Sequence, residues 1–165
     1  MFDEVSLQLA KRAGDALVAR AWRIATAESC TGGGVAMLLT AIAGSSEWVE
    51  RGFVTYTNEA KHEMLDVRLQ TLEKFGAVSE QTAQEMAQGA KAHSHADVTV
   101  SITGIAGPSG GTDEKPVGTV CFGYHIPGRD IITETCHFTG DRAMIRLTTI
   151  QYVLNRTVQL MENMA

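Results

Sequence analysis

Residues 26 to 34 read TAESCTGGG, a serine, a cysteine and a threonine followed at once by three glycines. An apolar-alternating run predicts a strand over residues 23–27, and Val35–Leu39 predicts a helix after the glycines. At such a strand-to-helix turn, free N–H groups and the helix dipole stabilise a bound anion, or the oxyanion formed when a serine attacks a carbonyl. Ser29 is therefore a candidate nucleophile. The alternative is that Ser29 or Thr31 only caps the helix.

A serine nucleophile needs a base, and Lys61 in the run YTNEAK (residues 56–61) is the candidate. With Asn58 as the helix cap, Lys61 occupies the third helical position, where the helix dipole disfavours an ammonium. The resulting decrease in pKa is what a general-base lysine requires. Tyr56, at the end of the preceding predicted strand, could relay a proton or orient the amine. The alternative is an ordinary exposed lysine beside a packed tyrosine.

Cys30 is a weaker candidate nucleophile, because no histidine lies near it in the sequence. The run His93-Ser94-His95 has a spacing that resembles a metal site, but it falls at the end of a predicted helix, where histidines favour the dipole. We therefore expect no bound metal ion and no cofactor.

Two further stretches carry features of a binding site. Residues 103–112, TGIAGPSGGT, follow a predicted strand and suit a loop whose backbone donors wrap a planar or phosphorylated ligand. The stretch is not G-x-G-x-x-G and no helical pattern follows, so a Rossmann site is not predicted. Arg142 and Arg146 lie one turn apart at the start of the last predicted helix, which Asp141 caps. Their guanidinium groups could bind one phosphate or carboxylate, or form a solvated shoulder of the helix.

Bulk composition restricts the class of protein. With 165 residues, 44% of them hydrophobic, residues 1–165 are expected to form one domain with a sizeable core. The net charge of −5 argues against a nucleic-acid-binding face. The longest apolar stretch, residues 35–43, is too short to span a membrane, and the acidic start does not resemble a secretory signal. Three scattered cysteines suggest no disulfide framework. We expect a soluble protein of the cytoplasm.

The elements that must position these residues alternate early between helices and strands. Helices are predicted over residues 2–20, 32–43 and 58–65, after Ser79, and from Asp141 onward; strands are predicted over 23–27, 53–56, 98–102, 117–126 and 130–138. The strand at 98–102 alternates valine or isoleucine with hydroxyl residues and is expected to be half-buried. The last two strands are joined closely enough to form an antiparallel hairpin. The pattern predicts an α/β fold, with a mixed sheet and helices on both faces.

Together these stretches resemble the C-terminal domain family of the competence/damage-inducible protein CinA. The resemblance runs nearly end to end and rests on motifs in the family's order: TAESCTGG, AGSS, GFVTYTNEAK, GAVSE, TGIAGPSGG, KPVGTV and GDR. It implies a three-layer α/β/α sandwich and hydrolysis of the carboxamide of nicotinamide mononucleotide to nicotinate mononucleotide and ammonia.

The resemblance also implies roles for individual residues. Ser29 would be the nucleophile, with Lys61 and Tyr56 as its base system and N–H groups of residues 30–33 receiving the oxyanion. The expected substrate-binding residues are Cys30, Thr31, Gly32, Gly33, Asn58, Thr103, Gly104, Arg142 and Arg146. Gly34 stands where the family leads us to expect a bulkier residue, and this extra glycine is expected to loosen the floor of the site.

Two alternatives stay open at the level of sequence. One is a non-catalytic or differently specific nucleotide-binding paralogue of the same fold. The other is an interaction protein whose helices serve mainly for dimerisation. The sequence leaves open the oligomeric state, with a homo-oligomer (a dimer or larger) among the states to be tested, as well as the true substrate and the pathway.

Overall fold

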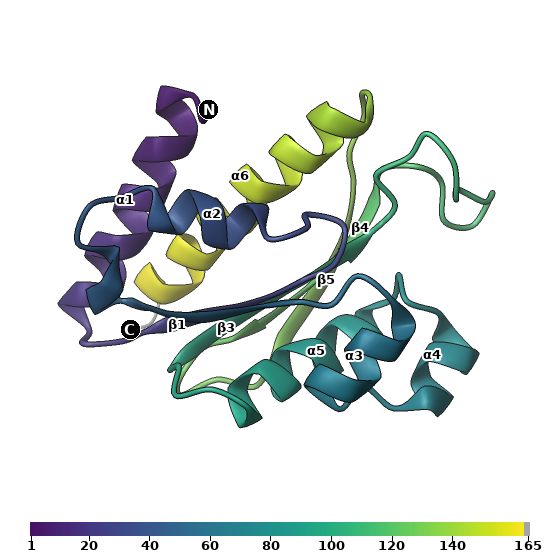
Figure 1. Ribbon diagram of the computed structural model, residues 1–165, viewed down its shortest axis with the longest axis horizontal. Coiled ribbons are helices and arrows are strands. Elements are labelled where there is room, and N and C mark those ends of the chain that lie inside the picture. The colour runs from purple at the N-terminus through teal and green to yellow at the C-terminus, as the bar shows by residue number, and fades with distance from the viewer. Residues whose placement is uncertain (164–165) are drawn as a thin grey trace.

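A five-stranded sheet forms the middle layer of the molecule in the computed structural model, which describes residues 1–163 (Figure 1). The strands are β1 (Ile24–Glu28), β2 (Val49–Val54), β3 (Val98–Gly104), β4 (Thr119–His125) and β5 (Ile132–His137), in the spatial order β2-β1-β3-β4-β5. β1 runs parallel to β2 and β3, whereas β4 is antiparallel to β3 and β5. The predicted mixed sheet and its closing hairpin are confirmed.

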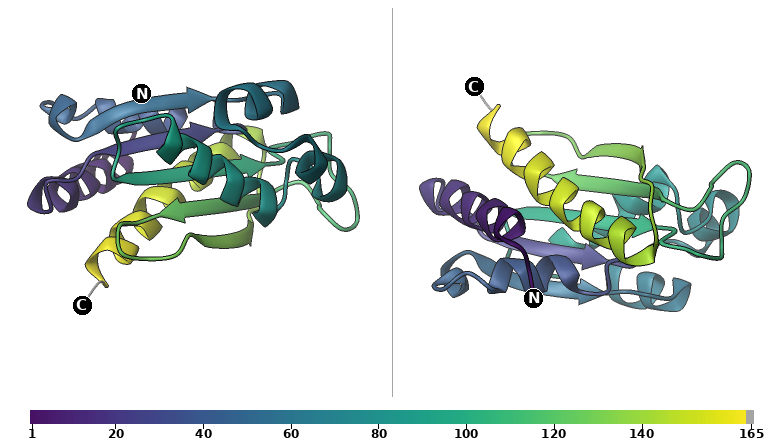
Figure 2. Two further views of the ribbon diagram at one scale, coloured as in Figure 1. Left: turned by 90° about the horizontal axis from the view of Figure 1, so that it is seen from below. Right: turned by 90° about the horizontal axis from the view of Figure 1, so that it is seen from above.

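Helices cover both faces of the sheet (Figures 1 and 2). On one face lie α1 (Glu4–Ala19), α2 (Gly34–Thr40) and α6 (Arg142–Glu162); on the other lie α3 (Asn58–Leu65), α4 (Leu69–Phe75) and α5 (Glu80–Ala92). A single 3₁₀ turn at Ser45–Glu47 precedes β2. The three-layer α/β/α architecture is therefore confirmed. None of the helices within residues 1–163 combines the length and the apolar composition needed to cross a membrane.

Two apolar cores hold the layers together. The larger one fills the space between the sheet and α1, α2 and α6, with side chains such as Leu17, Leu38, Phe122 and Leu154 fully buried. The smaller one lies on the other face and includes Leu65, Leu72 and Met86. The sheet is thus buried on both sides around its centre, which fixes the positions of its strand ends.

Strand β3 shows that burial on both faces does not require an apolar residue at every position. Val98, Val100 and Ile102 are fully buried, as predicted. Thr99 and Ser101 are fully buried too, because their hydroxyls donate to the carbonyls of Ala87 and Ala83 on α5, at 2.8 and 2.6 Å. The prediction of a half-buried strand is therefore wrong: a helix backbone, not water, satisfies these hydroxyls.

Several boundaries differ from those predicted. β2 spans Val49–Val54 instead of 53–56, so Tyr56 lies in the turn that follows the strand. α2 begins at Gly34 and not at Gly32, because Gly32 and Gly33 have positive φ angles of 60° and 93°. The short helix α4 was not predicted.

Candidate active site

The hydroxyl of Ser29 and the amine of Lys61 meet at the end of the sheet, although 32 residues separate them in sequence. The Lys61 Nζ lies 3.0 Å from the Ser29 Oγ. Ser29 directly follows β1, and Lys61 lies in the first turn of α3, which follows β2. Because β1 and β2 are parallel neighbours, their following segments meet at the same edge of the sheet. The amide of Thr55 fixes this meeting by donating to the carbonyl of Glu28, at 2.8 Å.

The surroundings of Lys61 favour its uncharged form. The residue is 1% exposed, and burial lowers its pKa because the ammonium would lose its hydration. Within residues 1–163 it forms no salt bridge to a carboxylate. The amine lies 3.0 Å from the carbonyl oxygen of Thr55 and 3.5 Å from that of Tyr56. An uncharged amine has two N–H groups and one lone pair, so two carbonyls can take both hydrogens and leave the lone pair for the Ser29 hydroxyl.

The cap of α3 is one residue earlier than predicted. Thr57 is the N-cap and its hydroxyl accepts from the amide of Ala60, whereas Asn58 is the first helical residue. Lys61 is therefore the fourth helical residue and not the third. It stays in the first turn, where the helix dipole opposes a positive charge, and Asn58 lines the cavity beside it.

The loop between Ser29 and α2 offers backbone donors. The amide of Gly32 donates to the Ser29 carbonyl at 2.9 Å, so it is not a free donor for an oxyanion in this structure. In the described part of the chain, the amides of Cys30, Thr31 and Gly33 have no hydrogen-bond acceptor. Cys30 lines the cavity next to Ser29. The residue after a nucleophile commonly supplies an oxyanion donor, and the Cys30 amide is available for that role. Thr31, Gly32 and Gly33, which were expected to bind the substrate, are not among the residues that line the cavity.

Glu28, which sequence reasoning missed, holds the conformation of this loop from the protein interior. Its carboxylate is 0% exposed and accepts four hydrogen bonds. Two come from the amides of Val35 and Ala36 at the start of α2, at 2.9 and 3.0 Å, and two from the hydroxyls of Thr26 and Thr31, at 3.1 and 2.6 Å. A carboxylate at a helix N-terminus satisfies free N–H groups and the dipole together. This overturns the interpretation that Ser29 or Thr31 caps α2.

The two arginines at the start of α6 contact different partners. Arg142 donates to the carbonyl of Gly107 at 2.8 Å and to the hydroxyl of Tyr56 at 3.1 Å, and it lines the cavity. Arg146 donates instead to the carbonyls of Cys30 and Thr31, at 3.2 and 3.3 Å, and is not among the residues that line the cavity. Tyr56 is 58% exposed, and in this arrangement Arg142, not Lys61, is the partner of its hydroxyl.

The cavity around Ser29 has a volume of about 270 Å³. The end of β3 and the loop after it form one wall, and in this strand Thr103 donates to the carbonyl of Ala77 at 2.8 Å. Gly104 allows β4 to approach closely, since a β-carbon there would lie 2.9 Å from the Thr119 carbonyl oxygen. The full lining is Ser29, Cys30, Tyr56, Asn58, Lys61, Ala77, Val78, Thr103, Gly104, Ile105, Ala106, Gly107, Ser109, Gly110 and Arg142. Arg142 is the cation of this lining, and no carboxylate is among the lining residues, so the cavity suits an anionic ligand.

The extra glycine at position 34 does not loosen the site. A β-carbon at Gly34 would lie 2.6 Å from the Cδ1 of Ile150 on α6. The space of the missing side chain is therefore filled by Ile150, which packs α6 against the first turn of α2. The expectation of a loosened floor is wrong for this reason.

Other candidate groups are less suited to catalysis. Burial raises the pKa of the Cys30 thiol to about 12, which keeps it protonated and unreactive at neutral pH. His93, in the predicted histidine run, pairs with Asp66 at 2.6 Å. Among residues 1–163, no three His, Cys, Asp or Glu side chains are arranged to hold a metal ion.

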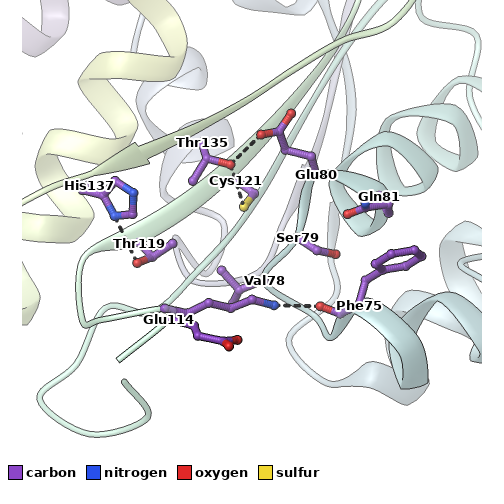
Figure 3. Close-up of a pocket in the computed structure, with 11 residues that line it drawn as sticks. Phe75, Val78, Ser79, Glu80, Gln81, Glu114, Thr119, Cys121, Thr135 and His137 are labelled. Atoms are coloured by element: carbon purple, nitrogen blue, oxygen red, sulfur yellow. Dashed lines mark hydrogen bonds between the residues drawn. The ribbon is translucent and has the colours of Figure 1, made fainter. Parts of the chain in front are cut away.

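A larger cavity of about 560 Å³ lies beside the first one, between α5 and the hairpin of β4 and β5 (Figure 3). Val78 lines both cavities. Two pairs of its polar side chains bind each other: Glu80 accepts from the hydroxyl of Thr135 at 2.7 Å, and His137 Nδ1 lies 3.3 Å from the Thr119 hydroxyl. Burial raises the pKa of Cys121 in this cavity. The pairing of a nucleophile with a base is found in the smaller cavity, which is therefore the candidate active site.

Comparison with known proteins gives a consistent set of relatives. A family model described as the CinA C-terminal domain matches residues 6–161. The chain is 53% identical over 154 residues to the nicotinamide-nucleotide amidohydrolase PncC of Escherichia coli K12, covering 93% of each protein. It is 43% identical over 145 residues to protein YdeJ of the same strain, covering 88% of this chain and 84% of that protein. A solved structure of a competence/damage-inducible protein from Agrobacterium tumefaciens superposes with a TM-score of 0.94 at 45% identity, covering 97% and 98% of the two chains.

Proposed function

The chain belongs to the CinA C-terminal domain family, and from this premise we propose that it is a nicotinamide-nucleotide amidohydrolase. The reaction converts nicotinamide mononucleotide to nicotinate mononucleotide and ammonia. The single observation that carries the proposal is the contact of 3.0 Å between the Ser29 hydroxyl and the buried amine of Lys61. A serine and an uncharged lysine at this distance form a nucleophile and its general base.

The first half of the reaction forms an acyl-enzyme. The Lys61 lone pair accepts the Ser29 proton as the oxygen attacks the carboxamide carbon. The amides of Cys30 and Thr31 receive the negative charge that develops on the carboxamide oxygen. Lys61 then gives its proton to the departing nitrogen, so that ammonia leaves and the ester to Ser29 remains.

The second half hydrolyses this ester. A water molecule loses its proton to Lys61 and attacks the same carbonyl carbon, and the oxyanion forms again against the same amides. Its collapse releases the nicotinate product, and Lys61 returns the proton to Ser29. The Ser29–Lys61 contact needs no tyrosine between the two groups, so Tyr56 serves to hold Arg142 at the cavity.

The charges of the cavity fit a phosphorylated substrate. Arg142 lines the cavity with both terminal nitrogens on neutral partners, the Gly107 carbonyl and the Tyr56 hydroxyl, and a phosphate would be a stronger partner for either. Gly107, Ser109 and Gly110 add loop atoms beside it. We propose that Arg142 and this loop bind the phosphate and the ribose of the substrate. We also propose that the reaction takes place in the cytoplasm.

The test is ammonia release by the purified protein with nicotinamide mononucleotide. Ser29→Ala is expected to abolish release and to keep substrate binding in calorimetry. Ser94→Ala is the matched control, because its hydroxyl contacts only the amide of Ala96, at 3.2 Å, away from the cavity. Binding without turnover by the wild-type protein would instead indicate a nucleotide-binding paralogue. No binding together with a stable dimer would indicate an interaction protein.

A further inference from the structure

Arg146 contacts the backbone of the nucleophile loop instead of the cavity. Its Nε donates to the carbonyl of Cys30 at 3.2 Å and its Nη2 to the carbonyl of Thr31 at 3.3 Å. One planar guanidinium therefore bridges the carbonyls of the two residues that directly follow Ser29. The absence of a side chain at Gly32 permits this, since a β-carbon there would lie 3.1 Å from the Arg146 Nη2.

The same loop is held from inside the protein by Glu28. The carboxylate accepts from the Thr31 hydroxyl at 2.6 Å and from the amides of Val35 and Ala36, the second and third residues of the following helix. The Thr31 side chain is thus fixed by the Glu28 carboxylate, and its carbonyl is fixed by the Arg146 guanidinium. Neither contact involves a group that reacts, so the charges of Glu28 and Arg146 serve to orient the loop.

We propose that Arg146 and Glu28 are positioning residues that fix the conformation of the loop carrying the amides of Cys30 and Thr31, so that this loop is ready to receive the oxyanion. This inference rests on the hydrolase function proposed above and concerns the step in which charge develops. It assigns Arg146 a role different from the substrate ligand expected from sequence.

Peptide geometry explains the effect of the clamp, by which we mean the two hydrogen bonds from Arg146 to the Cys30 and Thr31 carbonyls. In a trans peptide the C=O and the next N–H point in opposite directions, so holding the Cys30 carbonyl toward Arg146 turns the Thr31 N–H away from it. A charged donor on a carbonyl also polarises the peptide and strengthens its N–H as a donor. Stabilisation of an oxyanion depends on donors that are fixed before the charge appears. A free loop with two positive-φ glycines would lose that advantage.

The clamp and the substrate-ligand role predict different kinetics for Arg146→Ala. As a positioning residue, Arg146 supports the transition state only, so kcat should fall about 10- to 100-fold while KM stays within about threefold. The same factor should appear with nicotinamide mononucleotide and with its dephosphorylated nucleoside. Arg142→Ala is the comparison, because loss of a phosphate ligand should raise KM for the nucleotide alone.

Arg146→Lys separates shape from charge. A lysine keeps the positive charge but cannot bridge two carbonyls as a planar guanidinium does, so kcat should stay well below that of the wild type. Arg156→Ala is the control on the same helix: that arginine pairs with Glu134 at 3.2 Å, and its loss should leave kcat and KM unchanged. The thermal midpoint of each variant shows whether a kinetic change reflects unfolding.

Labelling of Ser29 by a fluorophosphonate distinguishes failure of this inference from failure of the proposed function. Phosphonylation also places negative charge on an oxygen facing the loop amides, so Arg146→Ala should label at least about tenfold more slowly. A wild-type protein that labels but releases no ammonia overturns the proposed substrate and still tests the clamp. An Arg146→Ala protein with raised KM for the nucleotide only, or with wild-type kcat and labelling rate, overturns the inference. A wild-type protein that neither labels nor turns over overturns both.

Discussion

The charge state of Lys61 can be measured through its effect on folding stability. Burial lowers the pKa of this amine in the folded protein, whereas in the unfolded chain it titrates at the ordinary lysine value of about 10.4. Between these two pKa values the unfolded chain holds one proton more than the folded protein. The free energy of unfolding must therefore rise with pH in this window, by up to about 1.4 kcal/mol per pH unit. At pH values below the folded-state pKa the amine is charged in both states, and the folded protein bears the full free-energy cost of burying an ammonium.

The substitution Lys61→Met isolates this contribution. Methionine removes the titrating group, and it also removes the hydrogen bonds to the Thr55 and Tyr56 carbonyls, worth about 1 kcal/mol each. That loss shifts the stability by an amount that does not depend on pH. The difference in unfolding free energy, wild type minus variant, should therefore increase from pH 6 to pH 10 in urea denaturation. Lys91→Met is the control, because it removes an exposed amine that also donates to a carbonyl, at 2.7 Å, so a pH dependence that both variants share does not come from burial of Lys61.

Enzyme kinetics must report the same group. If the uncharged amine is the base, kcat/KM rises with pH and levels off above the folded-state pKa that the stability curves give, and Lys61→Met lowers kcat by about 10²- to 10⁴-fold. Parallel stability curves for wild type and Lys61→Met from pH 6 to pH 10 would refute this reasoning. Lys61 would then be charged at neutral pH, and Ser29 would have no base.

Three other substitutions or treatments test the surroundings of the site. Glu28→Gln leaves one acceptor oxygen for four donors and should lower the unfolding free energy by about 2–4 kcal/mol; an unchanged urea midpoint would contradict the role of the carboxylate. Because burial raises the Cys30 pKa to about 12, iodoacetamide at pH 8 should leave ammonia release intact, and inactivation traced to Cys30 by mass spectrometry would argue otherwise. Gly34→Ala should gain about 1 kcal/mol of helix propensity once Ile150→Val makes room, so the double variant should unfold at higher urea than Ile150→Val alone; the reverse order would show that Ile150 is not the only obstacle.

The fold could be predicted from sequence where local pattern and burial agree. Alternation in β3 and the long apolar stripe of α6 gave the correct elements. The exposure of β3 could not be predicted, because alternation assumes that polar side chains meet water, whereas Thr99 and Ser101 meet carbonyls of α5. α4 was missed because its N-cap residue is Arg68, which makes no side-chain cap hydrogen bond and is not a residue type that marks a helix start.

The residues of the candidate site also divide into those that could be predicted from sequence and those that could not. Ser29 and Lys61 could be selected because hydroxyls and amines near helix starts are chemically unusual, and even the one-residue error in the cap of α3 left Lys61 in the first turn. Glu28 could not, since it lies inside a strand and six residues before the helix that it caps, outside the spacing of ordinary N-cap residues. The charge of Arg146 is evident from sequence, but its hydrogen-bond partners are not, because they are backbone carbonyls more than a hundred residues away along the chain.

The order and direction of the strands explain why these distant residues converge. β1, β2 and β3 are parallel, and β5 points the same way because it is antiparallel to β4, which is antiparallel to β3. Four strands therefore end at one edge of the sheet, and each is followed by a part of the site: the Ser29 loop, the start of α3, the glycine loop after Thr103, and the start of α6. The reversed strand β4 is what lets α6 begin at this edge. A parallel β4 would end beside the site itself, and the hairpin would then deliver Arg142 and Arg146 to the opposite end of the sheet.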